Sequence, residues 1–470
     1  MGYTPDVNSF DVVVLGGGSA GELIAEALAG AGRSVALVER HRVGGECPYV
    51  ACMPSKAMLR SSEVRQLVRT SHELGAVAAP IQLDDDDSAF GAAVARRDVI
   101  SDQRDDSGAA ESVNKAGATL LRGEAKIVAE GVIVIDGSEV GWRDLVIATG
   151  SRPTRPNIDG LDSVPTWTSD QALSSAHRPQ SMLVIGGGPV GCELSQLYAR
   201  FGTHVTLVEA GPQLAAGEEP TVSERLRDIL LSDGVDIRLG VEVKSVAPTP
   251  SGQAQVMLSD GKTVEVERLL LAAGRQPDTK GLGLDVLGIA VAPSGPIEVD
   301  DTGRVRGRDN VWAAGDVTGI GPFTHVANYQ GRLVSDNLLG GTRRADYRAI
   351  PRAIYTDPPV ASVGRNAADA ADAGIEVISA SLDLDEVARA TTEGGPSGVL
   401  VLIADREHKV IVGASAIGPR ADEWLAEMTL AIRAQIPIGI LADVIHAFPT
   451  FAEAYEPLFR QLVEQTNAHG

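Results

Sequence analysis

Two segments of the chain repeat one order of apolar and polar positions. Residues 11–39 read DVVVLGGGSAGELIAEALAGAGRSVALVE, and residues 182–209 read MLVIGGGPVGCELSQLYARFGTHVTLVE. In each segment an apolar run is followed by a glycine turn, a stretch with helical spacing of apolar residues, and a second apolar run. This order is typical of a βαβ unit. The repeat therefore predicts an α/β fold with two Rossmann-like domains.

The glycines of the two units lie at equivalent positions, 170 residues apart along the chain: Gly16, Gly18 and Gly21, and Gly186, Gly188 and Gly191. In such a unit the first glycine permits a tight turn, and the second lets the backbone approach a pyrophosphate. The third lets the helix pack closely on the strand, and the helix N-terminus faces the phosphate. The repeat therefore predicts two dinucleotide sites.

An acidic residue closes the second strand of each unit, at Glu39 and Glu209. Such a carboxylate can accept hydrogen bonds from both hydroxyls of an adenosine ribose. Sites for NADP usually replace this acid and add arginines, whereas Glu209 is followed by Ala-Gly-Pro-Gln. We expect a bound flavin dinucleotide and an exchanging nicotinamide dinucleotide, with NADH preferred and NADPH as the alternative donor.

Further apolar runs that end in turns follow the two units. They are LVIATGSRP at 145–153, LLLAAGRQPD at 269–278 and DNVWAAGDV at 309–317. The third of these ends in Gly315–Asp316, so we expect the Asp316 carboxylate to contact a ligand. Residues 81–110 have the least regular pattern, and the run Asp84–Asp87 is interpreted as a solvated loop or cap and not as a metal site. From about residue 350 the pattern changes. Alternating segments at 398–405 and 409–418, followed by a helical stretch at 422–434, predict an antiparallel sheet in a smaller third domain.

Composition and charge narrow the classes of function. The 470 residues carry a net charge of −22, which argues against nucleic acid as a partner. No stretch has the length and apolarity of a membrane span, and no secretion signal is visible at the N-terminus. Three cysteines do not form a disulfide framework. We therefore expect a cytoplasmic protein that does not associate with membranes.

Two of the cysteines lie close together, in GGECPYVACMPSK at 44–56. Zinc needs four ligands, and the third cysteine, Cys192, is best interpreted as a small apolar residue in the helix of the second unit. Cys47 and Cys52 follow the first unit by a few residues, near the carboxyl ends of its strands, where a flavin would sit. A helix start would also lower a thiol pKa. Redox chemistry is favoured, and two inert buried thiols are the alternative.

These motifs together resemble those of the class I flavin disulfide reductases, whose signature is GGTCxNxGCxPSK. The resemblance covers essentially the whole chain and includes GGGSAG, GGGPVGCE, GRQPD, AAGD and IYTDPPVASVG at 354–364. It implies an FAD-binding domain at 1–150 and 280–349, an NAD(P)-binding domain at 151–279, and an α+β dimerisation domain at 350–470. The family works as a homodimer that transfers electrons from NAD(P)H through FAD to a disulfide.

The resemblance also implies roles for individual residues. Cys52 would face the flavin as the charge-transfer thiolate, and Cys47 would be the interchange thiol that meets the substrate. Lys56 and Glu193 would pair near the flavin ring and the nicotinamide. Besides the motif glycines, the implied cofactor-binding residues are Glu39, Lys56, Ala125, Thr149, Gly150, Glu209, Gly274 and Asp316.

The chain departs from the family near its C-terminal end. The family's dithiol reductases carry His-x-His-Pro-Thr-x-x-Glu, in which the second His is the acid/base and the Glu orients it. Here IHAFPTFAE at 445–453 keeps His446 and Glu453 but places Phe448 at the catalytic position. Phenylalanine cannot transfer a proton. His446 either replaces the missing base or, as we favour, packs at the interface as its family counterpart does.

Three functions remain open at this point. The first is electron transfer through Cys47 and Cys52 to a small-molecule acceptor that needs little protonation, such as a metal ion, a quinone or an unusual disulfide. Mercuric reductases, which also lack the His, are the metal-reducing version. The second is thioether cleavage as in ketopropyl-coenzyme M oxidoreductase/carboxylase, where Phe excludes protons. The third is a structural flavoprotein subunit.

Overall fold

The computed structural model describes residues 8–293, 295–394 and 398–467, and the chain forms two compact units. The first unit contains the described residues of Met1–Ser55, Arg96–Thr154 and Gly274–Asp346. The second contains those of Lys56–Ala95, Arg155–Ala273 and Tyr347–Gly470. Each unit is built around its own copy of the βαβ repeat.

The first unit holds a seven-stranded sheet in the order β3-β2-β1-β6-β5-β4, with β17 on β6. The predicted unit appears as β1 (Asn8–Leu15), α1 (Ser19–Gly30) and β2 (Val35–Glu39), with β1 and β2 parallel. Residues 12–15 of β1 and all of β2 are buried on both faces of the sheet, which explains their continuous apolar runs. The other strands are β3 (Thr119–Arg122), β4 (Ala125–Ala129), β5 (Val132–Ile135), β6 (Ser138–Ile147) and β17 (Val311–Ala313), with β7 (Ser151–Pro153) pairing β16 (Arg275–Pro277).

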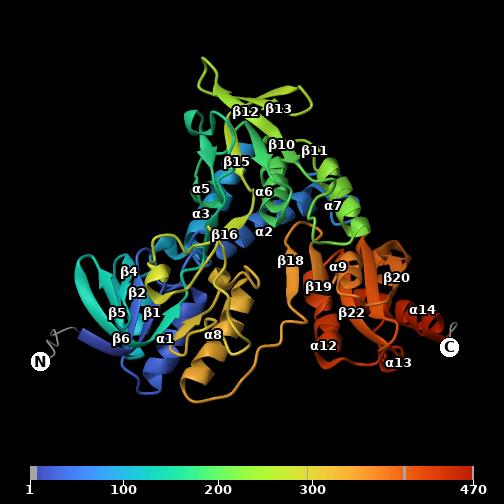
Figure 1. Ribbon diagram of the computed structural model, residues 1–470. Helices are drawn as coiled ribbons and strands as arrows, with labels where there is room; N and C mark the ends of the chain where they lie inside the picture. Colours follow the sequence, from blue (N-terminus) through green and yellow to red (C-terminus); the bar gives the residue numbers. More distant parts are fainter. Residues whose placement is uncertain (1–7, 294, 395–397, 468–470) are drawn as a thin grey trace, which may run out of the picture. The chain divides into compact units, whose positions relative to one another are not determined.

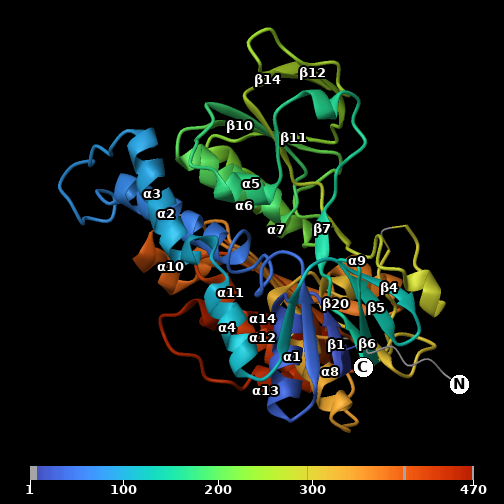
Figure 2. The same ribbon diagram turned by 90° about the vertical axis from the view of Figure 1, so that its left-hand side faces the viewer.

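Helix α8 (Thr324–Leu338) lies beside α1 in this unit (Figure 1). Figure 2 shows the same pair from the side, next to β1. A Cβ added at Gly331 of α8 would lie 3.2 Å from Leu23 and 3.3 Å from the carbonyl oxygen of Ala20, so glycine allows the two helices to approach closely. This contact holds the N-terminus of α1 against the rest of the unit.

The second unit contains the repeat as β9 (Ser181–Ile185), α6 (Pro189–Arg200) and β10 (His204–Glu209). These strands belong to a parallel sheet in the order β11-β10-β9-β15-β8, beside a three-stranded antiparallel sheet. The remaining strands of the two sheets are β8 (Thr166–Trp167), β11 (Asp236–Leu239), β15 (Arg268–Leu271), β12 (Val243–Pro248), β13 (Ala254–Leu258) and β14 (Thr263–Val266). The two parallel βαβ units confirm the predicted α/β class.

The predicted C-terminal sheet is antiparallel, in the order β18-β19-β22-β21-β20. Its strands are β18 (Pro351–Ile354), β19 (Val360–Gly364), β20 (Val377–Asp383), β21 (Val399–Asp405) and β22 (Val410–Ile417). Helix α7 (Pro220–Ser232) packs on one face, and α12 (Ala426–Ala434) and α14 (Tyr455–Asn467) pack on the other. Besides α3 (Asp86–Ile100), the other α-helices of the described residues are α2 (Cys52–Thr70), α4 (Ser107–Lys115), α5 (Ser169–Ser174), α9 (Ala367–Asp372), α10 (Ala388–Glu393), α11 (Ala421–Trp424) and α13 (Ile438–Leu441).

The expectation of an irregular segment at 81–110 was wrong for most of its length. Residues Asp86–Ile100 form helix α3, and α4 begins at Ser107. Phe90 and Val94 of α3 are buried one turn apart, and Asp86 and Asp87 form ion pairs with Arg65 and Arg178. The acids lie in the first turn, where a helix favours negative charge. The described residues contain no group of His, Cys, Asp or Glu that could hold a metal ion, and none of the described helices could span a membrane.

Candidate active site

The glycine turn of the first unit has the geometry that a bound pyrophosphate requires. Gly16 has a φ of +99°, and a Cβ on Gly21 would lie 1.9 Å from the carbonyl oxygen of Gly16. Glycine is therefore the only residue that fits at either position. A Cβ on Gly18 would have only Gly45 near it, at 4.0 Å, so space remains at the N-terminus of α1. These residues fit the phosphates of FAD.

The second turn reproduces this geometry. Gly186 has a φ of +109°, a Cβ on Gly191 would lie 1.9 Å from the carbonyl oxygen of Gly186, and nothing lies within 4 Å of a Cβ on Gly188. Pro189 begins α6, where the missing N–H costs nothing. The open position beside Gly188 fits the pyrophosphate of a nicotinamide dinucleotide.

The acids that close the second strands hold their own glycine turns. Glu39 accepts hydrogen bonds from the N–H groups of Gly17 and His41, each at 2.6 Å. Glu209 accepts them from Gly187 at 2.6 Å and from Gly211 at 2.7 Å. A carboxylate oxygen can accept more than one hydrogen bond, so capacity for ribose hydroxyls remains in both turns.

Burial raises the pKa values of two ionisable groups near the first glycine turn, Glu22 and Tyr49. Burial and the neighbouring Glu26 raise the pKa of Glu22, in the first turn of α1, to about 7. Burial, followed by the negative charges of Asp106 and Glu22, also raises the pKa of Tyr49, which lies between the two cysteines in the sequence. Because the raised pKa favours the neutral carboxyl, Glu22 adds less repulsion toward a phosphate at α1 than an ordinary carboxylate would.

Cys47 and Cys52 lie in the turn that leads into α2. Cys52 is the first residue of the helix, and its Sγ lies 3.6 Å from Oγ1 of Thr324. The carbonyl of Cys47 accepts a hydrogen bond from the N–H of Met53 at 2.9 Å, and both cysteines are half-buried. The helix N-terminus favours the thiolate form of Cys52. Cys192, by contrast, is fully buried in α6, and burial raises its pKa far above the ordinary thiol range.

A chain of polar contacts links Asp316 to the residue before Cys47. Oδ2 of Asp316 accepts a hydrogen bond from Ser151 at 2.6 Å, and Arg275 donates to Ser151 at 2.8 Å and to Glu46 at 2.6 Å. The sequence predicted Asp316 alone. The sequence pattern did indicate the two strand-and-turn segments that contain Ser151 and Arg275, but it did not identify these two side chains as members of the site.

The other predicted cofactor contacts of this unit lie around the same strands. Thr149 donates to the carbonyl of Asp278 at 2.8 Å, and Gly150 and Gly274 have positive φ values of +73° and +93°. Ala125 begins β4, two residues after Gly123, whose N–H donates to the carbonyl of Glu39. All of these residues belong to the unit that contains the cysteines.

Lys56 and Glu193 form the predicted pair in the second unit. Nζ of Lys56 lies 3.0 Å and 3.3 Å from the two carboxylate oxygens of Glu193, which is 8% exposed. The N–H of Tyr355 donates to the same carboxylate at 2.9 Å. Tyr355 was not predicted, although it lies within the quoted segment 354–364.

The three predicted residues of segment 445–453, His446, Phe448 and Glu453, lie in different environments. Phe448 is 78% exposed, whereas the His446 side chain is only 5% exposed and lies 3.2 Å from Glu427 and 3.5 Å from Glu456. Glu453 accepts a hydrogen bond from the N–H of Ala388 at 3.2 Å. Within its own chain the His446 side chain is therefore buried beside two carboxylates, and its packing at the subunit interface stays a prediction.

The chain matches two family models. Residues 10–331 match the pyridine nucleotide-disulphide oxidoreductase model, and residues 350–458 match its dimerisation domain. Among curated proteins, the mercuric reductase of Streptomyces lividans is 35% identical, over 95% of this chain and 94% of that protein. The dihydrolipoyl dehydrogenase of Chlamydia muridarum is 32% identical over 95% of both chains.

Solved structures give the same result. The HOCl-induced flavoprotein disulfide reductase RclA from Escherichia coli superposes with a TM-score of 0.83. It is 28% identical and covers 96% of this chain and 99% of its own. The likeness therefore extends over both units and over the C-terminal sheet.

Proposed function

This chain belongs to the pyridine nucleotide-disulphide oxidoreductase family, and we propose that it passes electrons from NADH through Cys47 and Cys52 to an acceptor that needs little protonation. Its relatives are FAD- and NAD(P)H-dependent oxidoreductases. The observation that carries the proposal is the placement of Cys47 in the turn before α2 and of Cys52 at the start of this helix, with Phe448 in place of the acid/base.

The residues divide the work as follows. Bound FAD would accept a hydride from NADH and pass the electron pair on to the disulfide. Gly18 and Gly188 leave room for the two pyrophosphates, Glu39 and Glu209 hold the turns beside them, and the start of α2 favours the Cys52 thiolate. We also propose that residues 1–150 and 280–349 form the FAD-binding domain, residues 151–279 the NAD(P)-binding domain and residues 350–470 the dimerisation domain.

The nature of the acceptor follows from Phe448. A thiol leaving a dithiol–disulfide exchange needs a proton, and the phenyl ring cannot donate one. A metal ion needs no such proton, and two observations favour it. The relatives include mercuric reductases, and RclA, a structural neighbour, has been solved as a Cu(II) complex. The acceptor class is therefore a small molecule or ion, with a soft metal cation as the leading candidate and a quinone as the second.

We further propose a cytoplasmic homodimer that does not bind nucleic acid. The dimerisation domain supports the dimer, and the net charge of −22 supports the exclusion of nucleic acid. A thiol pair that must cycle between oxidised and reduced forms suits a reducing compartment.

Anaerobic titration of the yellow protein with NADH tests the proposal. A long-wavelength charge-transfer band, with twice the electron uptake of the flavin alone, is the expected result. Bleaching at flavin stoichiometry would place the cysteines outside the electron path and would leave a direct flavin reductase of quinones or oxygen.

NADH should be the better donor. The 2′-phosphate of NADPH would lie near the Glu209 carboxylate, and each 1.4 kcal/mol of repulsion corresponds to roughly tenfold in kcat/KM. We expect a preference for NADH of about tenfold or more, measured by flavin reduction with each donor. The variant Glu209→Gln keeps an oxygen that can accept the hydrogen bond from the N–H of Gly187, and it should lower the ratio of the rates with NADH and NADPH. Equal or faster reduction by NADPH in the unaltered protein contradicts the prediction.

Replacing Phe448 by His should restore activity toward disulfides such as lipoamide. A positioned acid/base contributes on the order of 100-fold or more, so even an imperfectly placed imidazole should give about tenfold. The measurement is NADH-dependent reduction of lipoamide by Phe448→His, with Phe448→Leu as the control that changes the side chain without adding a base. If His and Leu give equal rates, the missing base is not the obstacle.

A further inference from the structure

The segment that joins β18 to β19 is fixed along one face of α6. Glu193, Gln196 and Arg200 lie on this face, and each binds the segment. Glu193 accepts from the N–H of Tyr355 at 2.9 Å. Gln196 both accepts from the N–H of Asp357 at 2.7 Å and donates to its carbonyl at 2.9 Å.

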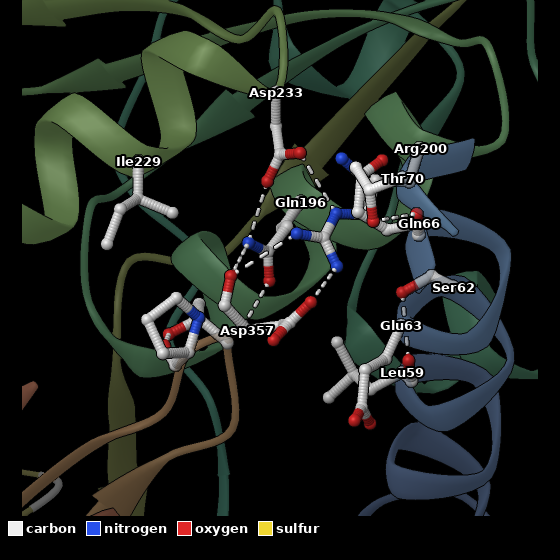
Figure 3. Close-up of polar contacts among 12 residues, drawn as sticks. Leu59, Ser62, Glu63, Gln66, Thr70, Gln196, Arg200, Ile229, Asp233 and Asp357 are labelled. Carbon is white, nitrogen blue, oxygen red and sulfur yellow. Dashed lines mark hydrogen bonds and ion pairs between the residues drawn. The ribbon is translucent and has the colours of Figure 1, made fainter. Parts of the chain in front are cut away.

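Arg200 completes this attachment (Figure 3). Its Nη1 lies 2.6 Å from the Asp357 carboxylate and its Nε lies 3.0 Å from Asp233. Gln196 donates to the same Asp233 at 2.8 Å. Because both the main chain and the side chain of Asp357 are bound, the backbone at Tyr355, two residues earlier, has little freedom to move.

Tyr355 contacts both members of the Lys56–Glu193 pair. Its N–H donates to Glu193, and its ring lies 4.4 Å from Nζ of Lys56. A cation at this distance from a ring centroid is attracted to the electron-rich face. The ammonium is thus held between a carboxylate and an aromatic ring, and both are positioned by α6 and by the segment bound to it.

We propose that Tyr355 is a positioning residue, whose ring holds the Lys56 ammonium against Glu193. The consequence for reactivity rests on the proposed function and on the resemblance to the family, which implies that this pair lies near the flavin ring and the nicotinamide. The contact itself does not depend on that function, so the two can be tested separately.

The contact is tested by brief acetylation of the FAD-loaded protein with acetic anhydride, followed by mass spectrometry of Lys56. Lys244, which is 55% exposed, serves as the internal reference. The ring lies over Nζ of Lys56 and limits the access of the reagent to the amine, so Tyr355→Leu should raise the relative labelling of Lys56 about threefold or more. Tyr355→Phe keeps the ring and should match the unaltered protein. Equal labelling in all three proteins, or a Phe variant that behaves like Leu, overturns the proposal.

The functional consequence is tested by stopped-flow reduction of the flavin with NADH. Tyr355→Leu should slow reduction about fivefold at saturating NADH while Tyr355→Phe does not, with FAD content and Tm checked for each variant. A protein that labels as expected but is not reduced by NADH contradicts the proposed function and leaves the contact standing. Altered labelling with unchanged reduction removes the positioning role. Tyr355→Gln replaces the Leu variant if the latter fails to fold, and the same outcomes apply.

Discussion

Replacing Cys47 by Ser is expected to leave FAD bound and to lower cysteine-dependent turnover by about a thousandfold or more. Reduction of a disulfide takes two electrons and two protons and converts one S–S bond into two thiols. A Ser–Cys pair has no bond that can accept these electrons. The Cys47 side chain is half-buried in the turn before α2, so its replacement by the similar hydroxyl should not disturb the fold.

The measurement is NADH-dependent turnover with metal, quinone and disulfide acceptors, together with the anaerobic absorbance of the variant. Cys192→Ser is the matched control, because Cys192 is buried in α6 and its thiol donates to the carbonyl of Gly187, a role that a hydroxyl can fill. This control should retain turnover. Unchanged turnover of Cys47→Ser with every acceptor would show that the thiols are spectators and that the flavin reacts directly.

Replacing Arg200 by Met should lower the free energy of unfolding by about 3–5 kcal/mol. The Arg200 side chain is 5% exposed and pairs with Asp233, which is 8% exposed, and with Asp357. Burial opposes the charge of Arg200, but the two carboxylates outweigh it and raise its pKa above the ordinary value. Methionine fills similar space but removes the cation that pairs with the buried Asp233 carboxylate.

The pH dependence of this contribution has a definite sign. A folded pKa raised above the unfolded value stabilises the protein fully below the unfolded pKa, which for arginine lies far above neutral pH. The contribution of Arg200 should therefore be constant through neutral pH.

The measurement is the free energy of unfolding of the unaltered protein and of Arg200→Met, obtained by denaturant titration. Arg227→Met, on an exposed face of α7 where the arginine pairs with Asp228 at 3.0 Å, is the matched control and should change the free energy by less than about 1 kcal/mol. If the two variants are destabilised equally, the buried network of Figure 3 contributes no more than a surface pair.

The sequence alone determined those parts of the protein that depend on neighbours along the chain. Gly16 and Gly21 lie five residues apart, and their contact follows from one turn and the helix after it. The same holds for Gly186 and Gly191, and for the cysteines in the turn before α2. Lys56 and Glu193 were paired correctly through the resemblance to a family, because 137 residues separate them and no local rule joins them.

Only the tertiary structure decided the contacts between distant segments. Tyr355 meets Lys56 because Asp357 is bound to α6, and the buried His446 side chain lies beside Glu427 and Glu456, which come from two different helices. The helix at Asp86–Ile100 is stabilised partly by Arg65 and Arg178, neither of which lies near it in the sequence. Burial and pairing of charges depend on which elements meet in space. Local periodicity therefore predicts the elements, and the packed fold decides which side chains act together.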